Sequence, residues 1–290
     1  MPVVLVMISL DFLAQPAGFD LGETGGWLFD ASQPLWQAML IGLSNTLRVS
    51  MPALLLALLL GTVVGMGRLS TEPVPRRLAG LYVNSLRNVP LLVQLLLWYF
   101  LLIECLPAPN EALHLLPGVW LSKGGLAFPW WAPEAGGWSL PAQEAFNVQG
   151  GAAVTPEYLA VAVSLSTYSA AFVAEVVRAA VTSVPAAMVE AAQTLGATQA
   201  QVRWRVVLPQ AWRAAMPPLS NQVLNLIKNS SLAVAVGYPD LVSVGNTALN
   251  QSGKVLECMG LMMMTYLMLS GLASLVMNLL GRHSRTVASQ

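Results

Sequence analysis

Polar and charged residues recur at helical spacing inside long apolar runs of this sequence. Ser164, Tyr168, Ala171, Glu175 and Arg178 lie three or four residues apart, so they share one face of a helix. A face that carries both a carboxylate and a guanidinium has the groups needed to hold a zwitterion. The same groups could instead bind one another and join neighbouring helices, and the sequence leaves both interpretations open.

A second polar stripe follows further along the chain. Asn221, Asn225 and Lys228 repeat the helical spacing, with Asn229 at the edge of the stripe. A lysine at the centre of a membrane helix costs about 2.5–3.5 kcal/mol on insertion scales, so we expect Lys228 to face the interior of a bundle. The candidate residues of a substrate pathway are therefore Tyr168, Glu175, Asn221, Asn225 and Lys228.

Patterns for catalysis and for cofactor binding are not found in the sequence. The chain has two histidines, His114 and His283, and no HExxH motif. Gly253-Lys254 lacks the glycine that a phosphate-binding loop would need at position 248. Two cysteines far apart indicate neither a disulfide framework nor a metal site. We expect no catalytic residue and no metal ligand in this chain.

The composition places most of the chain in lipid. Hydrophobic residues make up 56% and charged residues 10%, whereas soluble proteins carry about 25% charged residues. A membrane helix needs roughly 20 apolar residues. Residues 3–10 are too few to span, and the net charge of zero gives no electrostatic case for nucleic acid. We predict an all-α integral membrane protein of about five transmembrane helices, at 36–66, 89–106, 158–181, 219–238 and 256–280.

The arginines give this bundle an orientation, because cytoplasmic loops collect Lys and Arg. They gather after the first, third and fifth runs, whereas the segments between carry one lysine each. We therefore expect the N-terminus outside and the C-terminus inside. Residues 1–35 would form an extracytoplasmic segment, 107–155 a periplasmic insertion, and 286–290 a cytoplasmic tail.

The insertion at 107–155 is rich in proline and tryptophan. Its tryptophans could form a belt at the membrane surface, where aromatic side chains gather. They could equally form a docking surface for an external partner, and the composition does not decide between the two.

Residues 188–218 form a cytoplasmic segment that is longer than a connection needs to be. We predict two short helices, with Gly196 ending the first and Pro209 opening a further turn. Pro217 and Pro218 are expected to break the chain before the fourth span. A short helix with small residues around a glycine suits a groove on another protein. An amphipathic helix lying on lipid is the alternative.

These residues carry a resemblance to a known family. Glu190-Ala191-Ala192, Gly196 and Leu208-Pro209-Gln210-Ala211 resemble the EAA signature of the membrane subunits of bacterial ABC importers. "RNVPLLVQLLLWYF" (87–100), "AEVVRAAVTSVP" (174–185), "LPQAWRAAMPPLSNQ" (208–222) and "LIKNSSL" (226–232) are similar to the polar amino acid permease branch. "LPGVWLSKGGLAFP" (116–129) resembles the general L-amino acid subfamily, whose members usually have one more N-terminal span.

The resemblance implies a type I ABC importer permease fold over residues 36–285, in a bacterial inner membrane. A periplasmic binding protein would deliver an amino acid, and ATPase subunits would drive transport. ATP and magnesium would be bound by those subunits, with no cofactor in this chain. A second permease subunit, either a related chain or another copy, would complete the pathway. The implied ATPase-coupling residues are Glu190, Ala191, Ala192, Leu195, Gly196 and Ala197.

Two other classes of protein compete with this interpretation. An ion-coupled secondary amino acid transporter is compatible with Glu175 and Lys228, but the sequence has no detectable inverted repeat of the kind common in such carriers. The second competing class is a membrane scaffold that does not transport. The polar lining of three spans argues against it, because the fifth span repeats the helical spacing with Tyr266, Ser270, Ser274 and Asn278.

Overall fold

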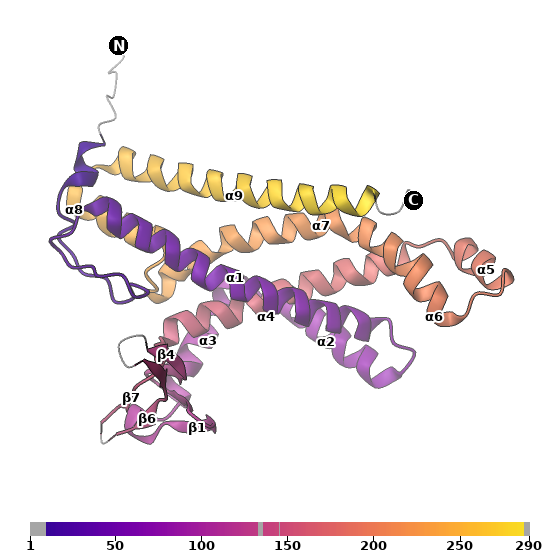
Figure 1. Cartoon of the computed structure of the whole chain (residues 1–290), viewed down its shortest axis with the longest axis horizontal. Coiled ribbons are helices and arrows are strands. Elements are labelled where there is room, and N and C mark those ends of the chain that lie inside the picture. The colour runs from indigo at the N-terminus through magenta and orange to yellow at the C-terminus, as the bar shows by residue number, and fades with distance from the viewer. Residues whose placement is uncertain (1–9, 133–135, 145, 287–290) are drawn as a thin grey trace, which may run out of the picture.

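The computed structural model describes residues 10–132, 136–144 and 146–286. It is mostly helical, and its long helices run along the longest dimension of the molecule (Figure 1). The short apolar run at 3–10 and the tail at 286–290 lie outside the described residues, apart from Leu10 and Thr286. The long helices are α1 (Leu35–Arg68), α4 (Pro156–Thr182), α7 (Leu208–Asn229) and α9 (Val255–Thr286).

Within the described residues, three helices are long and apolar enough to cross a membrane, and they are α1, α4 and α9. Each coincides with a predicted span to within a few residues. The pair α2 (Pro73–Asn88) and α3 (Leu91–Cys105) adds a fourth if it is one span bent by 105° at the break. The fourth predicted span, at 219–238, is shared between the second half of α7 and a 3₁₀ turn, Ser230–Val236.

Two helices were not predicted, and both have polar sequences. α2 carries three arginines within its 16 residues, and α8 (Leu241–Ser252) is a short helix capped by Asp240. α8 lies near the start of α1, and α5 (Ala186–Thr194) and α6 (Gln199–Gln201) project from the far end (Figure 1). We refer to these as the α8 end and the α5 end of the bundle.

Two expectations for the α5 end were wrong. Pro217 and Pro218 do not break the chain, because both lie inside α7. The second predicted short helix is likewise not separate, since α6 continues through a π-helical stretch, Val202–Val207, directly into α7. Each proline removes one backbone donor, but the remaining bonds of a 22-residue helix and its packing against α4 and α9 keep it continuous.

The insertion between α3 and α4 is built from short strands, which the sequence analysis did not predict. One sheet has the order β1-β2-β3-β8, and the others are the antiparallel pairs β4-β5 and β6-β7. The strands are β1 (Leu113–Leu116), β2 (Val119–Ser122), β3 (Gly125–Phe128), β4 (Trp130–Ala132), β5 (Gly137–Ser139), β6 (Ala142–Gln143), β7 (Val148–Gln149) and β8 (Ala152–Val154).

Close packing of α1 on α4 forms the centre of the bundle. A Cβ atom added to Gly61 would lie 2.6 Å from the Cβ of Val173, and one added to Gly65 would lie 2.7 Å from the carbonyl oxygen of Ala174. Only glycine permits this approach, which is typical of membrane helices with small residues four apart. The contact sets Arg68, the last residue of α1, beside Glu175 of α4.

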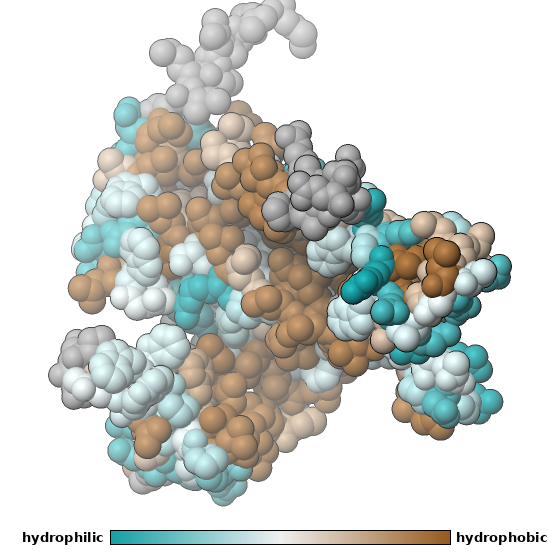
Figure 2. Space-filling model, turned by 45° about the vertical axis from the view of Figure 1, so that its right-hand side comes forward, coloured by the Kyte–Doolittle hydropathy of each residue, from teal (hydrophilic) through white to brown (hydrophobic). Residues whose placement is uncertain are grey.

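Hydrophobic side chains cover the middle of the molecule, and hydrophilic ones gather on the part that projects to the right, where α5 and α6 lie (Figure 2). At the α8 end, residues 10–34 fold over α1, α8 and α9 and bury Phe12 and Ala17. This segment is held by a bridge between Pro16 and Pro34 and by the bond from Leu35 N to Gln15 O, which is 2.9 Å long.

Candidate functional site

The segment at the α5 end is a helix, a tight turn and a second helix. α5 ends at Thr194, and Gly196 follows with a φ of +83°, a left-handed conformation that glycine adopts without strain. Ala197 N donates to Ala192 O at 3.0 Å, which closes the helix end in a Schellman-type turn. Thr198 then caps α6 in a capping box with Gln201.

The predicted coupling residues all lie on α5 or in this turn, away from the rest of the chain. α5 has no buried residue, and the Leu195 side chain is 88% exposed. Met188 and Trp204 are exposed nearby. Nothing within 4 Å would meet a side chain at position 196. Glycine is required here by the backbone conformation, and the exposed apolar side chains suit contact with another protein.

The polar stripe on α7 lies on the side of the helix that faces away from this chain. Val223, Leu226 and Ile227 are buried, whereas Asn221, Asn225 and Lys228 are exposed. Within the described part of the chain, these three side chains have no hydrogen-bond or ion-pair partner. A lysine charge is costly in lipid, so this face needs water or another subunit beside it.

The polar side chains of α4, in contrast, have their interaction partners within this chain. Glu175 accepts hydrogen bonds from the guanidinium groups of Arg68 on α1 and Arg178 on α4. Tyr168 packs against Phe172 with ring centroids 4.9 Å apart, and the Arg87 guanidinium of α2 lies 5.0 Å from the centroid of the Phe172 ring. Tyr168 and Glu175 therefore border α1 and α2.

The structure thus separates the five candidate pathway residues into two groups. Among the described residues, no hydrogen bond or ion pair joins Tyr168 or Glu175 to the stripe on α7. One group is tied to α1 and α2, and the other is on the free face of α7. A pathway that uses both groups has to pass across the bundle or be completed by another subunit.

The sequence analysis did not predict the interruption of the helix between α2 and α3, at Val89 and Pro90. Gln94, which is 3% exposed, donates to the carbonyl oxygens of Leu86 at 2.8 Å and Val89 at 3.0 Å, two groups that the break leaves free. Its own Oε1 has no partner in the described part of the chain. Discontinuous helices often line binding sites in transporters. The available signal was Pro90, which follows Val89 within the "RNVP" stretch.

A buried polar network at the α8 end was also missed. Asp240, which is fully buried, accepts from Ser243 N at 2.8 Å and from Tyr266 Oη at 3.4 Å. Burial raises the pKa of Asp240 to about 6. Asn45 on α1 donates to the carbonyl oxygens of Glu23 and Pro239. The network fastens the N-terminal segment, α1, α8 and α9 together.

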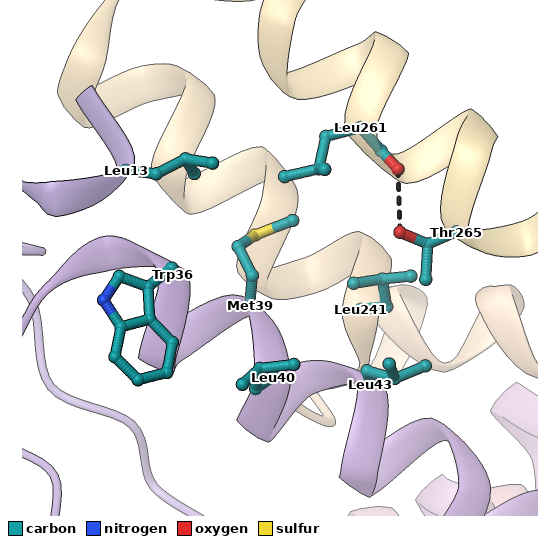
Figure 3. A pocket seen from close by; sticks show the side chains of 8 residues that line it. All are labelled: Leu13, Trp36, Met39, Leu40, Leu43, Leu241, Leu261 and Thr265. Carbon is teal, nitrogen blue, oxygen red and sulfur yellow. Dashed lines mark hydrogen bonds between the residues drawn. The ribbon is translucent and has the colours of Figure 1, made fainter. Parts of the chain in front are cut away.

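The cavities of the single chain do not fit a zwitterion. A cavity of about 230 Å³ at the α8 end is lined by leucines with Trp36 and Met39, and its Thr265 hydroxyl already donates to Leu261 O at 2.8 Å (Figure 3). A larger groove of about 770 Å³ between α1, α4, α7 and α9 is lined almost wholly by apolar side chains. A polar pathway is therefore not enclosed by the described part of this chain alone.

This combination defines a class of protein: a helical membrane subunit with a projecting helical loop and a polar face that it does not cover itself. The sequence profile of the "Binding-protein-dependent transport system inner membrane component" family matches residues 53–287. The chain belongs to this family, and it is the transmembrane subunit of an ABC importer.

Two relatives cover most of the chain. It is 33% identical to YhdX, a putative amino-acid ABC transporter permease protein of Escherichia coli K12, over 93% of this chain and 84% of that one. It is 34% identical to AapQ, a general L-amino acid transport system permease protein of Rhizobium johnstonii, over 92% of this chain and 81% of that one.

Solved structures show the same fold. An amino acid ABC transporter with histidines has a TM-score of 0.61 at 22% identity, covering 85% of this chain and 94% of that one. An inward-facing form of the MetNI methionine ABC transporter has a TM-score of 0.59 at 18% identity, covering 86% and 97%. The predicted permease fold is confirmed, and the secondary-transporter alternative is not favoured.

Proposed function

We propose that this chain is one of two permease subunits of an amino acid importer and that its α7 face lines the pathway. The observation that carries the proposal is the exposed stripe of Asn221, Asn225 and Lys228 on a helix whose other face is buried in the bundle. An ammonium and two amides offer donors to a carboxylate and acceptors to an amino group. The names of the relatives point to the same class of substrate.

The exposed stripe on α7 also supports a second permease subunit, because its side chains have no partner in the described part of this chain. The polar side chains of α7 would face lipid in an isolated chain, which membrane proteins avoid. A second subunit, either another copy or a related chain, would cover this face and enclose water between the two. Tyr168 and Glu175 remain candidate residues of the same pathway. The amino acid would reach them by passing the break between helices α2 and α3.

The segment at the α5 end is the proposed contact with the ATPase. Glu190, Ala191 and Ala192 lie on helix α5 (Ala186–Thr194), which has no buried residue, and Leu195, Gly196 and Ala197 lie in the turn that follows it. The exposed Leu195 would enter a groove on the ATPase. ATP and magnesium would be bound by that partner, and a periplasmic binding protein would deliver the amino acid.

The proposed orientation has the N-terminal segment outside a bacterial inner membrane and the C-terminal tail inside. In support, the end of α1, the start of α2, α5 and the C-terminal end of α9 all lie toward the same end of the bundle (Figure 1), and most of the arginines lie at or beside these segments, with Arg48, beside Gly25 of the N-terminal segment, as an exception. In intact cells, with the exposed Cys105 replaced by serine, Gly136→Cys should react with an impermeant reagent and Thr198→Cys should not.

The decisive experiment purifies the chain with its genomic neighbours and measures ATP hydrolysis. We expect hydrolysis to rise when binding protein and amino acid are added together, and to stay low with either alone. Stimulation by a non-amino-acid ligand of the binding protein would overturn the substrate class. Hydrolysis that ignores the binding protein would overturn the coupling scheme.

A further inference from the structure

The β4–β5 ribbon of the insertion presents a pair of tryptophans to its surroundings. Trp131 and Trp138 lie opposite each other across the two strands, so both side chains are on one face. Their rings meet edge to face with centroids 6.1 Å apart, and the side chains are 49% and 69% exposed. Trp130, on the other face, meets Phe128 at 5.9 Å and is also exposed.

The ribbon is fixed to the rest of the insertion. The Trp120 indole N–H donates to Pro141 O at 3.0 Å, and Gly151 N donates to Ser139 Oγ at 2.8 Å. A two-stranded ribbon alone is marginally stable, and these bonds attach it to the four-stranded sheet. The tryptophan pair is therefore held in place while it stays exposed.

Charged residues are scarce in the insertion that carries this aromatic pair. Residues 107–155 contain four in all, namely Glu111, Lys123, Glu134 and Glu144. The edge strand β1 adds further apolar surface, because Leu113, Leu115 and Leu116 are exposed. A monomeric protein in water rarely exposes such a surface.

The position of the insertion indicates what covers this surface. Both of its ends continue into apolar helices, since α3 ends at Cys105 and α4 begins at Pro156. The strands lie to one side of the long helices, below α3 in Figure 1, and not beyond the tips of the bundle. Because the long axes of spanning helices are close to the membrane normal, an element displaced sideways at a helix end extends along the membrane surface.

We propose that the insertion rests on the lipid surface and places Trp131 and Trp138 at the level of the headgroups. Indole rings favour this level because they combine an apolar body with a polar N–H. Unpaired strand edges are tolerated there, since water reaches the headgroups but not the hydrocarbon. A soluble partner such as a binding protein would approach along the membrane normal, whereas the insertion extends sideways.

The test measures lipid exposure in the assembled complex. The complex is reconstituted into nanodiscs with Cys105→Ser and Cys258→Ala, and a nitroxide is attached to Trp138→Cys, to Trp131→Cys in a second sample, and to Glu144→Cys as the control. Glu144 is exposed on the same insertion, and its charge favours water. Collision rates with oxygen, which dissolves in lipid, and with a water-soluble nickel complex are then compared.

We expect the oxygen-to-nickel accessibility ratio to be severalfold higher at positions 131 and 138 than at 144, with no binding protein present. Free access of nickel to 131 and 138 would overturn the proposal. If added binding protein then blocked that access, the ribbon would be a protein-docking surface. Protection from both reagents in the absence of binding protein would place the ribbon against another subunit and would also overturn the proposal.

Discussion

On α4, Glu175 accepts hydrogen bonds from Arg68 and Arg178, whereas on α7 Lys228 has no partner in the described part of the chain. A polar group away from water needs a hydrogen-bond partner. The α4 group finds its partners within the chain and joins α1 to α4. The α7 stripe and the exposed α5 segment depend on something that this chain does not supply. Substitutions in the α4 group should therefore lower stability, whereas substitutions in the α7 stripe or the α5 segment should lower uptake or coupling to the ATPase.

The largest effect is expected where the α5 segment meets the ATPase. Gly196→Asp adds a charged side chain to the contact, and an unpaired charge buried there would cost several kcal/mol. The membrane bundle has no atom within 4 Å of the added group and should fold normally. We expect loss of ATPase co-purification and of substrate-stimulated hydrolysis.

A matched control separates this contact from backbone strain. Gly253 also has a left-handed φ, ends helix α8 and has nothing within 4 Å of an added side chain. Gly253→Asp should reproduce the backbone cost and leave coupling intact. Equal loss in both variants, or normal coupling in both, would show that α5 does not dock on the ATPase.

A smaller loss is expected on the free face of α7. Lys228→Met keeps most of the length of the side chain and removes its charge. If the ammonium holds the carboxylate of the substrate, uptake should fall by a factor of about 10 to 150, because one hydrogen bond to a charged group contributes about 1.5–3 kcal/mol. Thermal stability should not fall. Lys254→Met removes an exposed lysine elsewhere and should leave uptake unchanged; equal uptake in the two variants would remove Lys228 from the pathway.

The ion-paired group on α4 should respond in stability. Glu175→Gln leaves Arg68 and Arg178 without their carboxylate, in a site that is about a quarter exposed, and should cost about 1–3 kcal/mol. Arg68→Gln should lower the melting temperature by a similar amount. Uptake per assembled complex separates the two interpretations of Glu175, because a fall in Glu175→Gln that Arg68→Gln does not share would place the carboxylate in the pathway.

The sequence predicted the parts of the fold that depend on long apolar runs. α1, α4 and α9 each have such a run. Gly61 and Gly65, four residues apart, are typical of close helix packing, but their spacing does not identify α4 as the partner. α2, α8 and the strands were missed because they are short or polar and their placement depends on tertiary contacts. The prediction of a chain break at Pro217 and Pro218 was wrong, because the packing of α7 outweighs the low helix propensity of proline.

Prediction of the candidate site had a similar limit. Helical spacing placed Glu175 and Lys228 on polar faces, and both faces exist in the structure. Spacing does not say which element packs against a face, so it could not distinguish the paired group from the unpaired one. The network around Asp240 and Asn45 was missed for the same reason, because its members come from segments almost 200 residues apart.

The smallest effect is expected at Asp240, where the direction depends on pH. Its pKa in the folded protein is about 6, above the ordinary value of 3.8, because burial disfavours the carboxylate. The folded state therefore binds a proton more tightly than the unfolded state does. Stability from this group is full at low pH, declines as the pH rises from about 4 to 6, and stays reduced above that range.

Asp240→Asn removes the buried charge and keeps an oxygen that can accept the bond from Ser243 N at the start of α8. The variant should be more stable than the native chain at pH 8, by on the order of 1 kcal/mol, since relief of desolvation exceeds the loss of a charged cap. The difference should shrink toward zero near pH 4. Melting curves of the purified complex across this range measure it. A variant that is less stable at pH 8 would show that the carboxylate of Asp240 is stabilised by its partners and that this network resembles the paired group on α4.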